Sequence, residues 1–127
     1  MITLEDALLL HAHSIAQYGG GAGVRDMEGL RSAIDRPFAT WGGENLYKDV
    51  FEQAAAIGES IVMNHPFVDG NKRTGLALMF AVLRLEGIIL NATPDEAYQF
   101  VVDLATGERR FEHAVEWLRT HSTPAKL

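Results

Sequence analysis

Residues 71–87 constrain the fold of this chain more than any other segment. Their spacing predicts a helix whose large apolar side chains fall on nearly every side: Leu76, Leu78, Met79, Val82 and Leu83. A helix that is hydrophobic all round is covered by other elements in a folded domain. We therefore expect this helix to lie at the centre of the structure, with residues 74–85 as its buried part.

Signals for further helices flank this central segment. Side chains suited to cap a helix N-terminus precede the expected helices: Thr3, Asp26, Asp49 and Thr93. The glycine run at residues 19–23 cannot sustain a helix, so the first helix should end at Tyr18. Gly107 should separate the last two helices. Together these features predict a compact all-α domain.

Residues 38–47 break the helical pattern. This segment contains Trp41, two adjacent glycines and then Leu46 and Tyr47, which is typical of a loop or a small β-hairpin. The chain has 127 residues, of which 47% are hydrophobic and 22% are charged, and this fits one folded domain over residues 1–127. We expect a flexible tail only at residues 122–127.

Charge and residue usage exclude several classes of function. The formal net charge of −6 weighs against general binding to DNA, RNA or anionic lipid, because such binding relies on a basic face. Cysteine is absent from the sequence, so disulfides and thiolate metal sites are excluded. The N-terminus does not resemble a signal peptide, and the longest apolar stretch, residues 76–83, is too short to span a bilayer. We expect a cytoplasmic protein without a membrane partner.

The junction between the two most apolar helices carries residues suited to phosphate chemistry. The first turn of a helix leaves backbone N–H groups unpaired and carries a partial positive charge, so it binds anions readily. Gly70 allows a ligand to approach this backbone closely, and Asn71 offers an amide. Lys72 and Arg73 add two positive charges at the same point. These four residues predict a phosphate-binding site.

Two further side chains of the junction complete a catalytic set. Asp69 beside a phosphate site is suited to hold Mg²⁺, which prefers one or two carboxylates together with phosphate oxygens. His65 is suited to accept a proton, because a free imidazole changes charge near neutral pH. Phe67 lies between them and should point into the core. The alternative is that this stretch has turn-forming residues for turn geometry alone, followed by a solvated Lys-Arg pair.

Residues 65–73, His-Pro-Phe-Val-Asp-Gly-Asn-Lys-Arg, resemble the signature of the Fic/Doc family, H-x-F-x-[D/E]-x-N-[G/K]-R. The form with Lys72 before Arg73 is similar to that of the death-on-curing (Doc) toxins. Upstream, Tyr18-Gly19-Gly20 and Arg25-Asp26 also resemble the N-terminal part of Doc proteins. The resemblance covers nearly the whole chain, and it implies a helical Fic/Doc fold with ATP as a substrate.

The resemblance also implies a reaction. Doc proteins are protein kinases that stop translation by phosphorylating a threonine of elongation factor Tu, and a small antitoxin protein neutralises them. By this resemblance His65 deprotonates the target hydroxyl while Asp69 holds Mg²⁺. The residues that would hold the phosphates of ATP are Gly70, Asn71, Lys72 and Arg73.

Most Fic enzymes transfer AMP instead, and two positions distinguish the reactions. The motif of these enzymes has Gly where this chain has Lys72, and a second Arg where it has Leu76. Doc proteins share both departures, so the resemblance favours the kinase. A Fic-type adenylyltransferase and a catalytically silent binding module of the same fold stay open as alternatives.

In this family a β-hairpin flap pairs with the backbone of the target, and residues 38–47 lie where the flap is expected. Trp41, Leu46 and Tyr47 are the candidate docking residues. The alternative is a surface loop with Trp41 packed onto the core. The stretch Thr40-Trp41-Gly42-Gly43-Glu44-Asn45 also matches the spacing of the family's inhibitory motif, [S/T]-x-x-x-E-[G/N]. That motif is normally helical and two glycines interrupt it here, so we interpret the match as coincidence.

Two other conspicuous features are interpreted as structural. His11 and His13 are two positions apart on the first helix, so they face different sides and cannot share a metal. The glycine run at residues 19–23 follows a helix rather than a strand, which indicates a helix terminator and not a phosphate loop.

Overall fold

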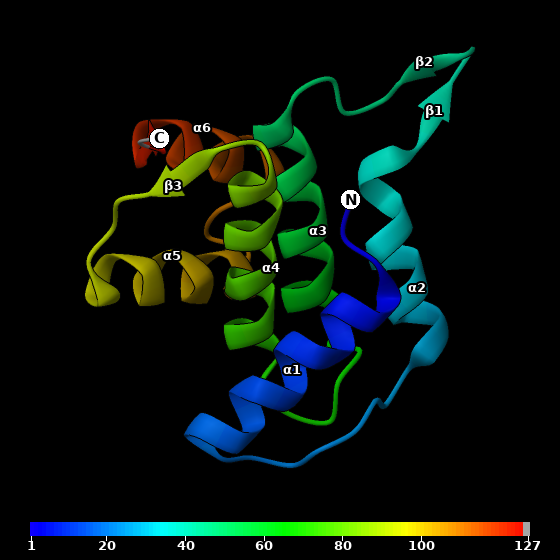
Figure 1. Ribbon diagram of the computed structural model, residues 1–127, viewed down its shortest axis with the longest axis vertical. Coiled ribbons are helices and arrows are strands. Elements are labelled where there is room, and N and C mark those ends of the chain that lie inside the picture. Colours follow the sequence, from blue (N-terminus) through cyan, green and yellow to red (C-terminus); the bar gives the residue numbers. More distant parts are fainter. Residues whose placement is uncertain (126–127) are drawn as a thin grey trace.

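Two neighbouring helices, α3 (Val50–Asn64) and α4 (Asn71–Leu85), form the centre of the computed structural model, which describes residues 1–125 (Figure 1). Four further helices surround them: α1 (Leu4–Tyr18), α2 (Met27–Asp35), α5 (Pro94–Thr106) and α6 (Phe111–Thr120). A short 3-10 helix, η1 (Arg36–Phe38), continues from α2. The mainly α-helical architecture that the sequence predicts is therefore confirmed.

The apolar core lies in two clusters that share α3 and α4. One cluster packs α5 and α6 against the central pair and includes Phe100 and Trp117, whose rings stack with centroids 3.9 Å apart. The other packs α1 and α2 against the central pair and includes the fully buried Leu30 and Phe67. Helix α4 is central as predicted, but the side chain of Phe80 is 38% exposed, so one face of the helix is incompletely covered. Within residues 1–125, no helix is long and apolar enough to cross a lipid bilayer.

Side chains cap most helices where the sequence indicates. The capping residues are Thr3 on α1, Asp26 on α2, Asp49 on α3 and Thr93 on α5. Helix α4 differs, because its N-cap is Gly70 and no side chain in the described part of the chain caps it. The N–H groups in the first turn of α4 are therefore available to another acceptor.

Gly75 allows α4 to pack closely against α3. A Cβ atom at this position would lie 2.7 Å from Cγ1 of Val62 and 3.4 Å from the carbonyl oxygen of Gly58. Valine is β-branched and has little rotamer freedom in a helix, so the two backbones would have to separate to make room.

We expect Gly75→Ala to lower the free energy of unfolding by about 1–2 kcal/mol. A packing clash costs about 1–3 kcal/mol, and contacts to a β-branched side chain and a backbone oxygen place this one at about 2–3 kcal/mol. The better helix propensity of alanine offsets about 1 kcal/mol of this cost. Chemical denaturation followed by circular dichroism measures the change. Gly58→Ala, on the facing helix, should destabilise the protein as well, because its Cβ would lie 2.3 Å from Sδ and 2.5 Å from Cγ of the fully buried Met79. Wild-type stability in Gly75→Ala would contradict the close packing.

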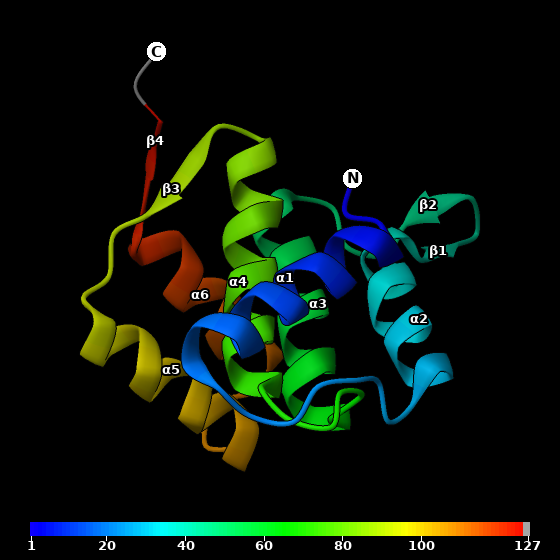
Figure 2. The ribbon, with the colours of Figure 1, turned by 60° about the horizontal axis from the view of Figure 1, so that its bottom comes forward.

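Two short antiparallel hairpins accompany the helices. Strand β1 (Thr40–Trp41) pairs with β2 (Glu44–Asn45), which confirms a hairpin within residues 38–47. Strand β3 (Ile88–Leu90) pairs with β4 (Ser122–Pro124), and the sequence did not predict this pairing (Figure 2).

The prediction of a flexible tail that starts at Ser122 is wrong, because this second hairpin includes the first three of its residues. Ser122–Pro124 form a paired strand, and the backbone N–H of Ala125 donates to the carbonyl oxygen of Gly87 at 2.7 Å. The remaining tail residues, Lys126 and Leu127, lie outside the described residues.

Candidate active site

The loop between α3 and α4, residues 65–70, lies at one end of the molecule (Figure 1). Helix α3 ends at Asn64, and His65 follows as its C-cap in the left-handed conformation, with φ of 50° and ψ of 56°. Among residues 1–125, His65 is the one non-glycine residue with a positive φ. Because this conformation is uncommon for a residue with a Cβ atom, the surrounding contacts must stabilise it.

Arg25 supplies contacts of this kind. Its Nε donates a hydrogen bond to the carbonyl oxygen of His65 at 2.9 Å, and its Nη2 donates to that of Asn64 at 3.0 Å. The carbonyl groups at the end of a helix carry a partial negative charge, which the guanidinium complements. The backbone N–H groups of Arg25 and Asp26 both donate to the carbonyl oxygen of Pro66. These bonds fix the start of the loop, and the side chain of His65 is left exposed.

Phe67 anchors the middle of the loop. Its side chain is fully buried, as expected, and its backbone forms an isolated β-bridge with Val24. The side-chain amide of Asn71 accepts a hydrogen bond from the N–H of Phe67 at 3.0 Å and donates one to its carbonyl oxygen at 3.1 Å. Asn71 therefore holds the loop against the first turn of α4, a contact that the sequence did not predict.

Two backbone N–H groups fix the carboxylate of Asp69. Gly70 donates to Oδ1 at 2.8 Å, and Gly21 donates to Oδ2 at 3.3 Å. These hydrogen bonds, helped by the nearby charge of Arg73 and opposed by desolvation, hold the pKa of Asp69 below its ordinary value of 3.8. The side chain is exposed and anionic at neutral pH. Its oxygens keep lone pairs that a cation can use, so Asp69 fits the chemistry of a Mg²⁺ ligand.

Lys72 and Arg73 lie in the first turn of α4, as expected, and both are exposed. The Nε of Arg73 donates to Oγ of Ser14 at 2.9 Å, and its Nη2 donates to the carbonyl oxygen of Gly19 at 2.8 Å. Arg73 therefore joins the start of α4 to the end of α1. A guanidinium has more N–H donors than these two bonds use, so Arg73 can still bind an anion.

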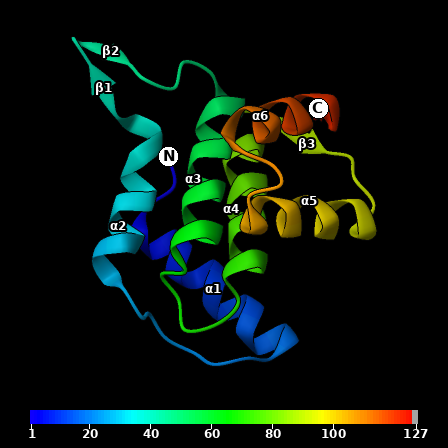
Figure 3. The same ribbon diagram turned by 180° about the vertical axis from the view of Figure 1, so that it is seen from behind.

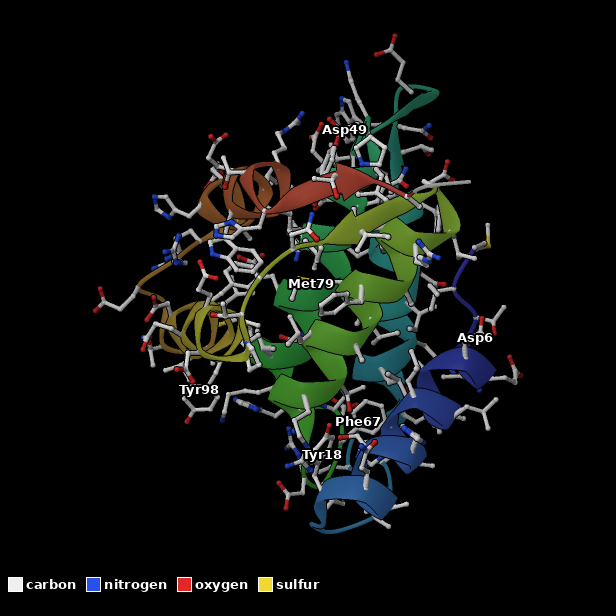
Figure 4. All side chains as sticks on the ribbon, turned by 60° about the vertical axis from the view of Figure 1, so that its left-hand side comes forward. Asp6, Tyr18, Asp49, Phe67, Met79 and Tyr98 are labelled. Atoms are coloured by element: carbon white, nitrogen blue, oxygen red, sulfur yellow. The ribbon has the colours of Figure 1, made fainter. Side chains whose placement is uncertain are left out.

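A cavity of about 770 Å³ opens beside the loop. The six candidate catalytic and phosphate-binding residues all line it: His65, Asp69, Gly70, Asn71, Lys72 and Arg73. The rest of the wall is mainly apolar and includes Phe80 of α4 and Tyr98 of α5. Figure 4 shows Tyr18 and Tyr98 at the end of the molecule that holds Phe67. The incompletely covered face of α4 is thus a wall of this cavity.

The structure does not bring the candidate docking residues to this cavity. Trp41 is 83% exposed, so the alternative of Trp41 packed onto the core is wrong, and Leu46 is exposed as well. Tyr47 is half-buried, and its hydroxyl accepts a hydrogen bond from Nε of Arg36 at 2.8 Å. The hairpin precedes α3 and His65 follows it, so a helix of 15 residues, about 22 Å long, separates them (Figure 3).

A target strand paired with the hairpin would therefore lie far from His65. The inhibitory-type match at residues 40–45 lies on the same hairpin and does not line the cavity, in agreement with a coincidental match.

Two contacts to the loop come from residues interpreted above as structural. The glycine run ends α1 as predicted, but Gly21 also donates to Asp69. His11 is 4% exposed, and its Nε2 lies 2.8 Å from the carbonyl oxygen of Asp69. The sequence carried part of this signal, since His11 falls at helical spacing with Ala7 and Ile15. Its partner lies 58 positions away and follows only from the fold.

Three carboxyl groups make stability sensitive to acid. Capping-box hydrogen bonds hold the pKa of Asp6 below 3.8 and that of Glu96 below 4.5. The bonds from the backbone N–H groups of Thr3 and Thr93 contribute most. Backbone hydrogen bonds likewise hold the pKa of Asp69 below its ordinary value. A pKa lowered by folding means that the folded state binds fewer protons than the unfolded state. The stabilisation is therefore complete above the ordinary pKa values and is lost as the pH falls.

We expect the free energy of unfolding to decrease as the pH falls below about 5. Urea denaturation at a series of pH values measures this decrease. In the double variant Asp6→Asn, Glu96→Gln the capping side chains no longer titrate, so its loss of stability in acid should be smaller. An equal loss in the variant and the wild type would contradict the assignment.

Comparison with known proteins finds matches over most of the chain. The model of the Fic/DOC family matches residues 1–83, which include the loop and most of α4. Toxin Doc of Mycolicibacterium smegmatis is 40% identical over 100 residues, covering 77% of this chain and 76% of that protein. Protein kinase doc of Escherichia phage P1 is 32% identical over 118 residues, covering 93% of this chain and 92% of that protein.

Proposed function

Because this chain belongs to the Fic/DOC family, we propose that it is a Doc-type toxin that transfers the γ-phosphoryl group of ATP to a hydroxyl group of a target protein. One observation carries the proposal: His65, Asp69 and the uncapped start of α4 all line the same cavity. A proton acceptor, an anionic metal ligand and a phosphate-binding helix terminus are the groups that phosphoryl transfer requires.

The start of α4 would bind the phosphate groups. Gly70 has a φ of 75° and no side chain, so a phosphate can approach the N–H groups of the first turn. The helix dipole and the side chains of Lys72 and Arg73 add positive charge at the same point. Positive charge placed where the transferring group becomes more negative lowers the barrier to transfer.

Asp69 and His65 would have separate roles in the transfer. Asp69 would hold Mg²⁺, which neutralises charge on the phosphate oxygens when bound. His65 would take the proton of the target hydroxyl as its oxygen bonds to the γ-phosphorus and the bond to ADP breaks. The exposure of His65 leaves its imidazole accessible to a protein substrate.

The apolar part of the cavity would take the nucleoside. Helices α4 and α5 contribute the aromatic side chains of Phe80 and Tyr98 to this wall. Aromatic rings pack favourably against flat ring systems such as a nucleobase. In this arrangement the phosphates lie at the start of α4 and the base lies between α4 and α5.

Lys72 offers a test of the phosphate site that leaves both His65 and the proposed nucleobase wall unchanged. We expect Lys72→Met to lower kcat/KM for ATP about tenfold to a hundredfold, because a hydrogen bond to a charged group contributes about 1.5–3 kcal/mol. Steady-state transfer from labelled ATP to the target measures the change. Lys48→Met is the matched control, since Lys48 is exposed near the hairpin, away from the loop. Equal values for wild type and Lys72→Met would contradict the role of Lys72.

The similarity to Doc proteins supports a proposal for the protein partners of this chain. One relative is named a toxin and another a protein kinase. From the resemblance to Doc proteins we propose a threonine of elongation factor Tu as the target. We further propose a cytoplasmic location and a cognate antitoxin that neutralises the protein. Induced expression in bacterial cells tests the toxin function. Incorporation of labelled methionine should stop on induction, and continued incorporation with confirmed expression would contradict it.

The adenylyltransferase alternative is weakened by two residues of the cavity. Lys72 occupies space where most Fic enzymes have a bare glycine, and Leu76 stands where they have a second arginine. Without that arginine this position offers no charge for a further phosphate.

A further inference from the structure

His11 is a buried polar group that the proposed reaction does not use. It lies on α1, and its imidazole is 4% exposed. The ring stacks on that of Phe67, with centroids 3.9 Å apart and an angle of 7° between the planes. Its Nε2 lies 2.8 Å from the carbonyl oxygen of Asp69. A buried imidazole needs a hydrogen-bond partner, and here that partner is the backbone of a candidate site residue.

The direction of this hydrogen bond is fixed by chemistry. A carbonyl oxygen can only accept, so Nε2 of His11 donates. The stack on Phe67 holds the plane of the imidazole, and the hydrogen bond then holds the Asp69 carbonyl. His11 therefore fixes two residues of the loop from a helix that lies 58 positions earlier in the sequence.

Asp69 is consequently held on both its backbone and its side chain. His11 binds the carbonyl oxygen, while Gly21 and Gly70 bind the two carboxylate oxygens. The space is tight, because a Cβ atom on Gly20 would lie 2.7 Å from Oδ2 of Asp69. The carbonyl of Asp69 and the N–H of Gly70 belong to one peptide group, so rotation of that group on release of the carbonyl would move the Gly70 donor away from the carboxylate. The carboxylate would then be held by Gly21 alone.

We propose that His11 is a positioning residue that fixes the Asp69 peptide and so directs the carboxylate toward the phosphates in the cavity. This inference rests on the proposed function, in which Asp69 holds the metal ion. Groups that orient a metal ligand typically change metal affinity or activity tenfold to a hundredfold when they are removed. His11 does not touch the substrate, so its effect passes through Asp69.

Substitutions can separate positioning from packing. His11→Phe keeps a ring to stack on Phe67 but removes the donor. His11→Gln keeps an N–H donor without the ring. His13→Phe is the matched control, because His13 is exposed on the same helix. If His11→Phe does not fold, His11→Met takes its place as the variant without a donor.

The first measurement needs neither nucleotide nor metal. In two-dimensional NMR spectra of the free protein, the amide signals of Gly21 and Gly70 report their hydrogen bonds to the Asp69 carboxylate. We expect both signals to shift in His11→Phe and to return toward the wild-type positions in His11→Gln. Wild-type amide signals in the folded variant without a donor would overturn the inference.

The second measurement is the affinity for Mn²⁺ in the presence of a non-hydrolysable ATP analogue. Electron paramagnetic resonance monitors the binding. We expect His11→Phe to bind Mn²⁺ about tenfold more weakly than wild type, with His11→Gln between them and His13→Phe unchanged. Equal affinities in His11→Phe and wild type would overturn the inference. If wild type binds no Mn²⁺ with the analogue, the proposed function fails, whereas the amide signals still decide whether His11 positions Asp69.

Discussion

Replacing His65 should lower the rate of phosphoryl transfer at least about a hundredfold while the protein stays folded. A positioned general base contributes about a hundredfold to ten-thousandfold to a rate, and an imidazole is the acceptor that the cavity offers to the target hydroxyl. The side chain is exposed, so its removal leaves no hole in the core. Single-turnover transfer from labelled ATP measures the effect.

The backbone of His65 decides which variants are informative. Its left-handed conformation disfavours most residues with a Cβ atom, but asparagine tolerates it better than alanine does. His65→Asn therefore accompanies His65→Ala, and thermal unfolding shows whether each variant is folded. His13→Ala is the control on an exposed histidine outside the cavity. Wild-type transfer in both folded His65 variants would contradict the assignment of the base.

Asp69→Asn should have an effect of similar size, at least about a hundredfold on transfer at a fixed Mg²⁺ concentration. The substitution removes the negative charge that binds the cation. It also places an NH₂ group where Gly21 or Gly70 now donates, so one of the two hydrogen bonds is lost. Removal of one electrostatic contact to a transition state typically costs about a hundredfold to a thousandfold in rate.

The dependence on metal concentration identifies this role. We expect the transfer rate of Asp69→Asn to rise with Mg²⁺ over a range in which the wild type is already saturated. Asp35→Asn, at an exposed carboxylate at the end of α2, is the matched control and should follow the wild-type curve. If Asp69→Asn has a reduced rate but a wild-type Mg²⁺ dependence, Asp69 does not hold the metal ion.

Local sequence signals predicted most of the helical framework. Thr3, Asp26, Asp49 and Thr93 cap the helices that they were expected to cap. The glycine after Tyr18 ends α1 as expected. Capping and helical periodicity depend on neighbours within a few positions, so a single sequence contains the information.

Pairings between distant segments were not predictable in the same way. Ile88–Leu90 is too short to show a strand pattern, and it pairs with Ser122–Pro124, more than 30 positions later. The hydrogen bond from His11 to Asp69 likewise requires α1 to pack beside the loop that precedes α4. The glycines at residues 42–43 indicated a hairpin, but its distance from His65 is set by the length of α3.

The candidate site was predictable as a set because its residues are contiguous. Residues 65–73 form one loop and one helix turn, and the structure shows that seven of them line the same cavity, including all six candidate residues. The groups that fix the loop come from elsewhere in the chain. Arg25 holds the backbone of His65, and Gly21 holds the carboxylate of Asp69. These supporting contacts depend on the packing of α1 and α2, which no local pattern specifies.

The identity of the transferred group is the most direct test of the proposed phosphotransferase activity. The purified protein is incubated with Mg²⁺ and elongation factor Tu or a cell extract, in parallel reactions with ATP labelled at the α- or the γ-phosphate. We predict that label from the γ-phosphate reaches the target protein, that label from the α-phosphate does not, and that His65→Asn abolishes the signal. Transfer of label from the α-phosphate alone would show that the cavity transfers AMP, and it would contradict the proposed phosphotransferase.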